Sequence, residues 1–127
     1  MVTDAYLAKY AEESLDGGLY VEGGHLDRIQ IGPDGRIQAA LIVLHRRPRV
    51  GGPSSIRVDL VYPWGGRADE YIVFDIPPQE FVSQDGSMFI DFGMDAPVEG
   101  HYKLVVSGGG GEVTVPVELF QAPGAQA

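Results

Sequence analysis

The sequence predicts an all-β domain: an antiparallel β-sandwich, immunoglobulin-like or C2-like, with a small barrel as the second choice. Three observations carry the prediction. Roughly eight or nine short strand patterns follow one another at a spacing typical of sandwiches. The 18 glycines and 9 prolines of the 127-residue chain stand between these patterns as turn signals. The chain ends in two alternating segments joined by glycines, which is the pattern of a β-hairpin.

The terminal hairpin is the clearest element. Residues 101–107 and 112–120 alternate apolar and polar side chains around Gly108–Gly111. We expect the inward set to be Tyr102, Leu104 and Val106 with Val113, Val115, Val117 and Leu119. Pro116 has no N–H to donate, which places this last strand at an edge or at a bulge.

The remaining strands are expected between turn signals such as Pro33-Asp34-Gly35 and Pro63-Trp64-Gly65-Gly66. They are Leu19–Glu22, His25–Ile31, Arg36–Arg46, Ile56–Tyr62, Tyr71–Ile76 and Ser87–Phe92. Because both faces of Arg36–Arg46 are apolar, this strand should be central and covered on both sides. Ala5–Ser14 suits either a strand or a helix; the strands that follow favour a strand. Residues 1–120 should form one domain, and residues 121–127 a flexible tail.

The composition excludes several classes of function. There is no cysteine, and the sequence holds no nucleophile elbow, no zinc-protease motif and no phosphate-binding loop. A net charge of −9 argues against nucleic-acid binding. The start of the chain does not resemble a signal peptide, and no apolar run is long enough for a membrane span, so we expect a cytoplasmic protein. We expect no cofactor and no catalytic residue.

Two alternatives to this expectation involve metals. The histidines His25, His45 and His101 would have to converge on a cavity to form a cupin-like, small-ligand or metal-dependent β-barrel enzyme. A calcium-dependent binding module would use the acids at turns, which are Asp85, Asp91, Asp95 and Glu99. The simpler interpretation is that the three histidines are unrelated surface residues and that the turn acids are solvated.

The charges are separated along the chain. Residues 28–67 hold seven arginines and two acids, net +5, whereas residues 68–102 hold eight acids and no lysine or arginine, net −8. One interpretation is that arginines and acids pair across neighbouring strands. The other is a dipolar molecule, in which Arg46, Arg47 and Arg49 form a loop that docks on an acidic surface of another protein or of a second copy.

Trp64 is the second candidate for partner contact, because it lies between Pro63 and two glycines in a predicted turn. The alternative is that its side chain folds back and caps the end of the core. With the arginines, it leads us to expect a non-enzymatic protein-binding or self-assembling structural module, with possible homo-oligomers.

The beginning and the end of the chain resemble a family of small uncharacterised bacterial proteins. The resemblance rests on Lys9-Tyr10-Ala11-Glu12, Asp16-Gly17-Gly18-Leu19-Tyr20-Val21, Gly23-Gly24, Asp27-Arg28-Ile29, Pro97, Gly100-His101-Tyr102, Val105, Gly108 and Val113–Val117. It implies a bacterial protein with a predicted immunoglobulin-like sandwich and supplies no catalytic residues. Where members carry an aromatic residue after the paired glycines, this chain has His25-Leu26.

Overall fold

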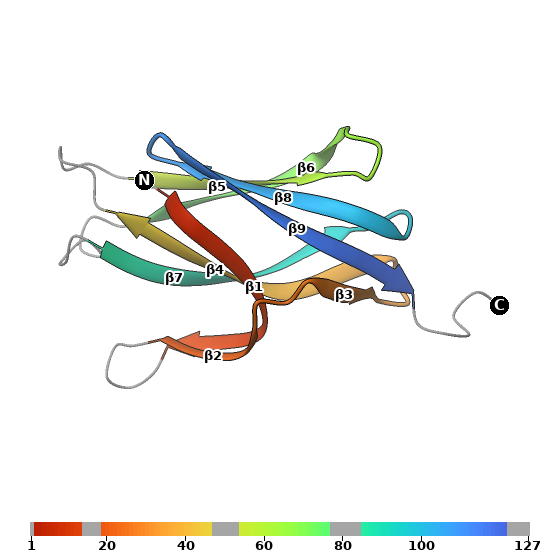
Figure 1. Cartoon of the computed structure of the whole chain (residues 1–127), viewed down its shortest axis with the longest axis horizontal. Coiled ribbons are helices and arrows are strands. Elements are labelled where there is room, and N and C mark those ends of the chain that lie inside the picture. The colour runs from red at the N-terminus through yellow and green to blue at the C-terminus, as the bar shows by residue number, and fades with distance from the viewer. Residues whose placement is uncertain (1, 14–18, 47–53, 77–84, 122–127) are drawn as a thin grey trace.

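The computed structural model describes residues 2–13, 19–46, 54–76 and 85–121, which form nine β-strands and no helix (Figure 1). The strands are β1 (Val2–Glu13), β2 (Leu19–Gly24), β3 (Arg28–Ile31), β4 (Arg36–Arg46), β5 (Ser54–Val61), β6 (Arg67–Ile76), β7 (Asp85–Asp95), β8 (Gly100–Gly108) and β9 (Gly111–Gln121). The predicted all-β class is confirmed, and the segment that also suited a helix is strand β1. A membrane-crossing helix is absent from these described segments.

The strands form two sheets. Sheet A has the order β2-β1-β4-β7, and sheet B has the order β3-β9-β8-β5-β6. Every pair is antiparallel except β3 with β9, which is parallel. The parallel pair is the one departure from the predicted antiparallel arrangement.

One core lies between the two sheets, since its buried side chains come from both of them. Leu7, Ile37, Leu41, Ile56, Leu60, Tyr102, Leu104 and Leu119 are the largest of these that are almost fully buried, together with Met94. The apolar side chains on alternate residues of each strand point into this space because the side-chain period of a strand is two. Two sheets that share one core in this way have the layered packing of a sandwich.

Strand β4 is buried on both faces, as predicted from its sequence. Leu41 points into the main core, while Ala40 and Ile42 belong to a second apolar cluster on the opposite face of sheet A. Leu19 and Val21 of β2 pack against that second cluster. The β1–β2 hairpin therefore supplies part of the cover for the outer face of β4.

The terminal hairpin is confirmed, with a shorter turn than the four glycines suggest. Gly108 and Gly111 are paired strand residues, so only Gly109 and Gly110 form the turn. Their φ values of 59° and 87° fit a two-residue type I′ turn, which side chains other than glycine adopt poorly. The sheet order places β9 inside sheet B, but β3 pairs only with Glu118–Gln121. Pro116 therefore lies on a stretch that has β8 as its one paired neighbour.

Candidate protein-binding surface

The structure separates the sequence-predicted contact residues. Arg46 ends β4 opposite Asp85, whereas Arg36, at the other end of β4, is bonded to Glu70 and lies near the β5–β6 turn that carries Trp64. The 11 residues of β4 span about 35 Å at the usual rise of a strand. The β5–β6 turn, which carries Trp64, and the end of β4, which is Arg46, therefore lie toward opposite ends of the molecule (Figure 1). Arg47 and Arg49 lie outside the described residues, as does the side chain of Arg46.

Trp64 is exposed and held in place by its neighbours. The turn is closed by the Tyr62 N–H, which donates to the Gly66 carbonyl at 2.8 Å. The indole stacks on the Tyr62 ring, with centroids 4.6 Å apart, and Tyr62 in turn meets the buried Tyr102 edge to face. One face of the indole is thus supported from the core, while the side chain remains 63% exposed. It does not cap the core itself.

A buried carboxylate lies on the outer face of sheet B, away from the core. Asp59 is 2% exposed; on the same face Arg57 is exposed, whereas Val105, opposite Asp59 on β8, is buried. Its Oδ2 accepts from Nε of Arg57 at 2.9 Å and from Nη1 of Arg67 at 3.2 Å, and its Oδ1 accepts from Nη2 of Arg57 at 3.1 Å. Two guanidinium groups therefore enclose one carboxylate, which satisfies its buried charge.

Tyr71 supports the same cluster. It stands opposite Asp59 across the β5–β6 ladder, and the guanidinium carbon of Arg57 lies 4.2 Å from the centre of its ring. The hydrogen bond to Asp59 is the largest of the effects that raise the pKa of Arg57 above its ordinary value. Arg57 is thereby held between a carboxylate below and an aromatic face beside it.

Exposed apolar side chains are concentrated on the same hairpin and beside its turn. Four of the six large, exposed apolar side chains of the described residues lie on the β5–β6 hairpin or beside its turn: Trp64, Tyr71, Val73 and Val98. Tyr102 of β8 connects this turn to the loop before β8. Its ring contacts Tyr62 at the turn, and its hydroxyl donates to the carbonyl of Val98 in the loop. We call the outward side chains of Arg57, Asp59, Arg67, Tyr71 and Val73, together with Trp64 at the adjoining turn, the hairpin face.

Sequence reasoning found Trp64 but missed most of the hairpin face. The alternation of apolar and polar residues along β5 could have revealed Arg57 and Asp59. Because Ile56, Val58 and Leu60 point inward, these two residues must both point outward. Whether Tyr71 or Ile72 would share that face depends on the pairing of β6 with β5. The ladder sets Tyr71 opposite Asp59 and Ile72 opposite Val58, which a single sequence does not specify.

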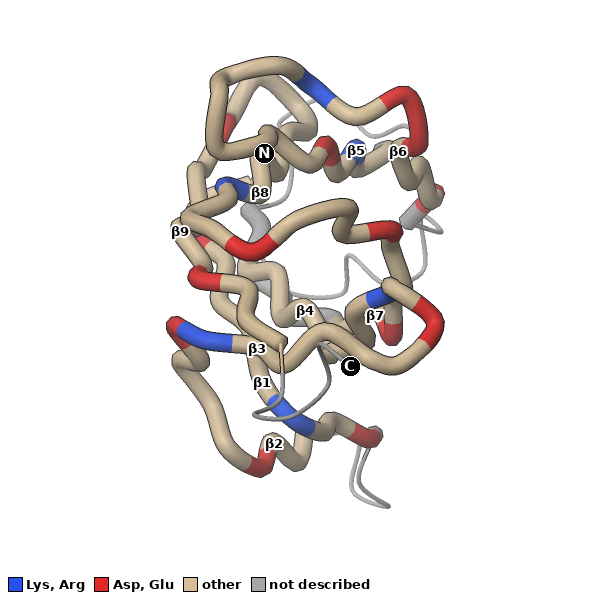
Figure 2. Tube along the Cα trace, turned by 90° about the vertical axis from the view of Figure 1, so that its right-hand side faces the viewer, with Lys and Arg blue, Asp and Glu red and all other residues tan. Residues whose placement is uncertain are grey.

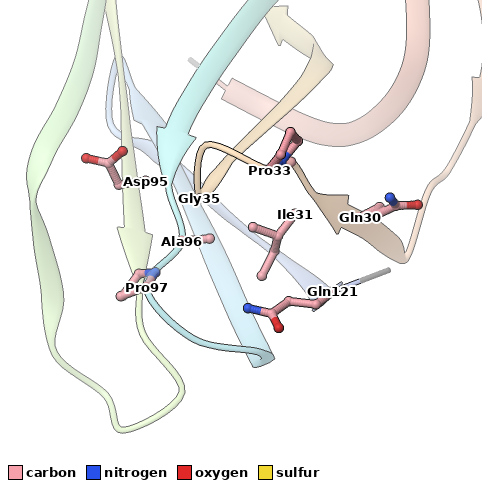
Figure 3. Close-up of a pocket in the computed structure, with 9 residues that line it drawn as sticks. Gln30, Ile31, Pro33, Gly35, Asp95, Ala96, Pro97 and Gln121 are labelled. Carbon is pink, nitrogen blue, oxygen red and sulfur yellow. The ribbon is translucent and has the colours of Figure 1, made fainter. Parts of the chain in front are cut away.

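A hollow of about 480 Å³ lies at the end of the sandwich where β3, β7 and β9 finish (Figure 3). Asp95 is the one ionisable residue of its lining, and Figure 3 shows it on the opposite side from Gln30. Its Oδ1 already accepts from Nη1 of Arg36 at 2.8 Å. The lining therefore offers neither an acid–base pair nor a nucleophile with a base.

Among the described residues no group of three potential metal ligands occurs, and the side chains of His45 and Asp85 lie outside them. His25 stacks on Tyr6 with ring centroids 4.2 Å apart. Among the turn acids, Asp95 is paired with Arg36, and Glu99 accepts from the Gln121 N–H at 2.6 Å.

In the structure, the described arginine side chains are paired with acids, and the acidic block follows two strands. Each arginine with a described side chain is paired with an acid: Arg28 with Glu118, Arg36 with Asp95 and Glu70, and Arg57 and Arg67 with Asp59. The acidic block, by contrast, runs along β6 and β7, which are edge strands of the two sheets (Figure 2). Its members there include Asp69, Asp75 and Asp91, together with Glu70 and Asp95, which pair with Arg36.

Searches of protein-family models and of curated proteins find no match to this chain. The resemblance to small bacterial proteins therefore stays a prediction.

Proposed function

We propose that this chain is a non-enzymatic protein-binding module whose partner docks on the hairpin face. The observation that carries the proposal is that one hairpin presents half-exposed Tyr71 and Val73 beside two oriented arginines and carries exposed Trp64 at its turn. Tryptophan, tyrosine and arginine are the residue types that contribute most energy at protein interfaces. Trp64 and Arg57 also rest on aromatic neighbours, so their ordering on binding costs less entropy.

Of the two sandwich types expected, the immunoglobulin-like one is the better supported. Strands β1-β4-β7 against β9-β8-β5-β6 follow the immunoglobulin order A-B-E against G-F-C-C′, with β2 and β3 as additions. Tyr102, near the start of β8, donates its hydroxyl to the Val98 carbonyl at 2.6 Å. A tyrosine at this place with a bond a few residues upstream is the tyrosine corner of such domains.

Contact through side chains is favoured over the addition of a strand to a sheet edge. The edge strand β6 carries acids and a shift in its pairing with β5, both of which hinder edge-to-edge pairing. The part of β9 that β3 leaves unpaired contains Pro116, which has no N–H. The partner is therefore expected to meet the outer face of sheet B rather than its edges.

Self-assembly is the second candidate. The concentration of acids along β6 and β7 provides a surface on which Arg46, Arg47 and Arg49 of another copy could dock. Replacing these three arginines by glutamate should then abolish any assembly detected by light scattering at low salt. Assembly that persists in the triple variant would exclude this route.

The test of the hairpin face is a capture experiment with matched variants. Tyr71→Ser with Val73→Ser removes two side chains that are 52% and 53% exposed, and Tyr10→Ser with Tyr20→Ser removes two that are 46% and 50% exposed on the β1–β2 hairpin. Immobilised wild type, test variant and control variant are incubated with an extract of the source organism. Proteins retained by wild type and control but lost from the test variant support the proposal. Equal retention by the test variant contradicts it, as does loss from the control alone.

A further inference from the structure

We propose that the partner presents an acidic segment, and that a carboxylate of this segment binds between Arg57 and Arg67. The inference rests on the proposed function and adds the chemistry of the partner. It assigns Asp59 the role of positioning both guanidinium groups, and Tyr71 and Val73 the role of contacting an apolar side chain next to that carboxylate.

Arg57 and Arg67 keep hydrogen-bond donors that Asp59 does not use. A guanidinium group carries five N–H donors. The contacts with Asp59 use two donors of Arg57 and one of Arg67. Both side chains are about half exposed, at 50% and 55%, so their outward N–H groups face solvent. Donors on two fixed guanidinium groups suit a second carboxylate, which accepts paired hydrogen bonds.

Both guanidinium groups are held in place before a partner binds. Arginine side chains lose substantial rotamer freedom when a partner fixes them. Here the buried carboxylate of Asp59 holds both guanidinium groups, and the ring of Tyr71 holds Arg57 from one side. Much of this ordering cost is therefore met in the free protein, which favours the recognition of a planar anion at this place.

Basic side chains outnumber acidic ones around Asp59. Arg57, Arg67 and Lys103 stand around the single negative charge of Asp59, because Lys103 lies opposite Val61 in the β5–β8 ladder and Arg67 lies opposite Val61 in the β5–β6 ladder. The centre of the outer face is thus positive in a chain of net charge −9. Acids on other strands of the sheet lie around this centre: Asp69 and Asp75 on β6, and Glu112 and Glu118 on β9, the last paired with Arg28.

The surrounding surface specifies the rest of the segment. Val73 stands opposite Arg57, and Tyr71 stands opposite Asp59. Alternate side chains of an extended chain lie about 7 Å apart on one face. An extended segment that carries an acid and an apolar residue at alternate positions would therefore set its carboxylate over the arginines and its apolar side chain on Tyr71 or Val73.

The test uses defined peptides and NMR of the full chain. A soluble heptapeptide with Glu and Val at alternate outward positions is titrated while the Nε–Hε signals of Arg28, Arg57 and Arg67 are followed. Two further probes replace Glu by Gln or by phosphoserine. The variant Arg67→Gln leaves the paired contact of Arg57 with Asp59 in place. Arg28→Gln is the matched control, because Arg28 is also 55% exposed, paired with an acid and stacked on an aromatic ring.

The expected result is that the Glu peptide shifts Arg57 and Arg67 but not Arg28, and binds about tenfold more tightly than the Gln peptide. Arg67→Gln should weaken binding about tenfold, and Arg28→Gln less than twofold. The inference is overturned if the Glu and Gln peptides bind equally, or if the Glu peptide does not bind at all. It is also overturned if Arg67→Gln and Arg28→Gln weaken binding equally, or if the phosphoserine peptide binds more tightly than the Glu peptide. If the capture experiment still depends on Tyr71 and Val73 in that case, the proposed function stands and only the acidic chemistry is wrong.

Discussion

Replacing Asp59 by asparagine tests whether its carboxylate organises the hairpin face. The substitution keeps the shape of the side chain and removes its charge. Asparagine offers one oxygen to the guanidinium groups, and its amide group points N–H donors at a site already filled with donors. The three contacts between 2.9 and 3.2 Å can therefore not all be kept.

The size of the effect follows from burial. Asp59 is 2% exposed, so a polar group left unpaired there is costly, whereas the two arginines are about half exposed and regain water. Leaving one buried polar group unsatisfied costs roughly 1–3 kcal/mol, and we expect Asp59→Asn to cost about 2 kcal/mol. For a domain of this size, that lowers the melting temperature by about 6–8 °C.

The assay is thermal and urea unfolding followed by circular dichroism, with Asp95→Asn as the control. Asp95 also bonds an arginine, at 2.8 Å, but its side chain is 69% exposed, so its loss should shift the melting temperature by less than about 2 °C. Equal shifts in the two variants, or no shift in Asp59→Asn, would refute the reasoning that burial makes this carboxylate structural.

Two further predictions concern the support beneath Trp64. Burial raises the pKa of the Tyr102 hydroxyl above its ordinary value of 10, because the folded protein holds the hydroxyl proton more tightly than the unfolded chain does. The stability that Tyr102 contributes in this way is present below pH 10 and is lost as the pH rises through the folded-state pKa. Tyr102→Phe removes the hydrogen bonds with Val98 and should cost about 1–2 kcal/mol of stability at pH 8. The variant should also lose less stability than the wild type between pH 8 and pH 10.5, as measured by urea unfolding. An equal fall of the urea midpoint in the variant and the wild type over this pH range would contradict the prediction. Gly100→Ala places a methyl group 2.7 Å from the Pro63 ring at a φ of 152° and should cost about 1–3 kcal/mol by urea unfolding. Gly35→Ala, at a φ of 77° with no atom within 4 Å, should cost less, and the reverse order would exclude close packing as the cause.

Much of the fold could be predicted because strands display their inward face in the sequence. The apolar run that follows the turn Pro33-Asp34-Gly35 located β4 at its observed bounds, Arg36–Arg46, and its two apolar faces identified it as central. Glycines located the terminal hairpin, since only a turn with two positive φ values needs them side by side.

Features that depend on pairing between distant strands could not be predicted. The parallel contact of β3 with β9 joins segments about ninety residues apart in sequence and has no local signature. The enclosure of Asp59 requires Arg67 to return across a turn and a shift in register, and the position of Tyr71 depends on that same register. The hairpin face is therefore a product of topology, while Trp64 was visible because turn residues mark it directly.

Photo-crosslinking in the source organism tests the central claim most directly. A photoreactive phenylalanine analogue replaces Tyr71 in one variant and Tyr20 in another, two positions of nearly equal exposure at 52% and 50%. The account predicts a crosslink to a different protein from position 71 and none from position 20. A crosslink from position 20 alone, or none from position 71, would contradict it.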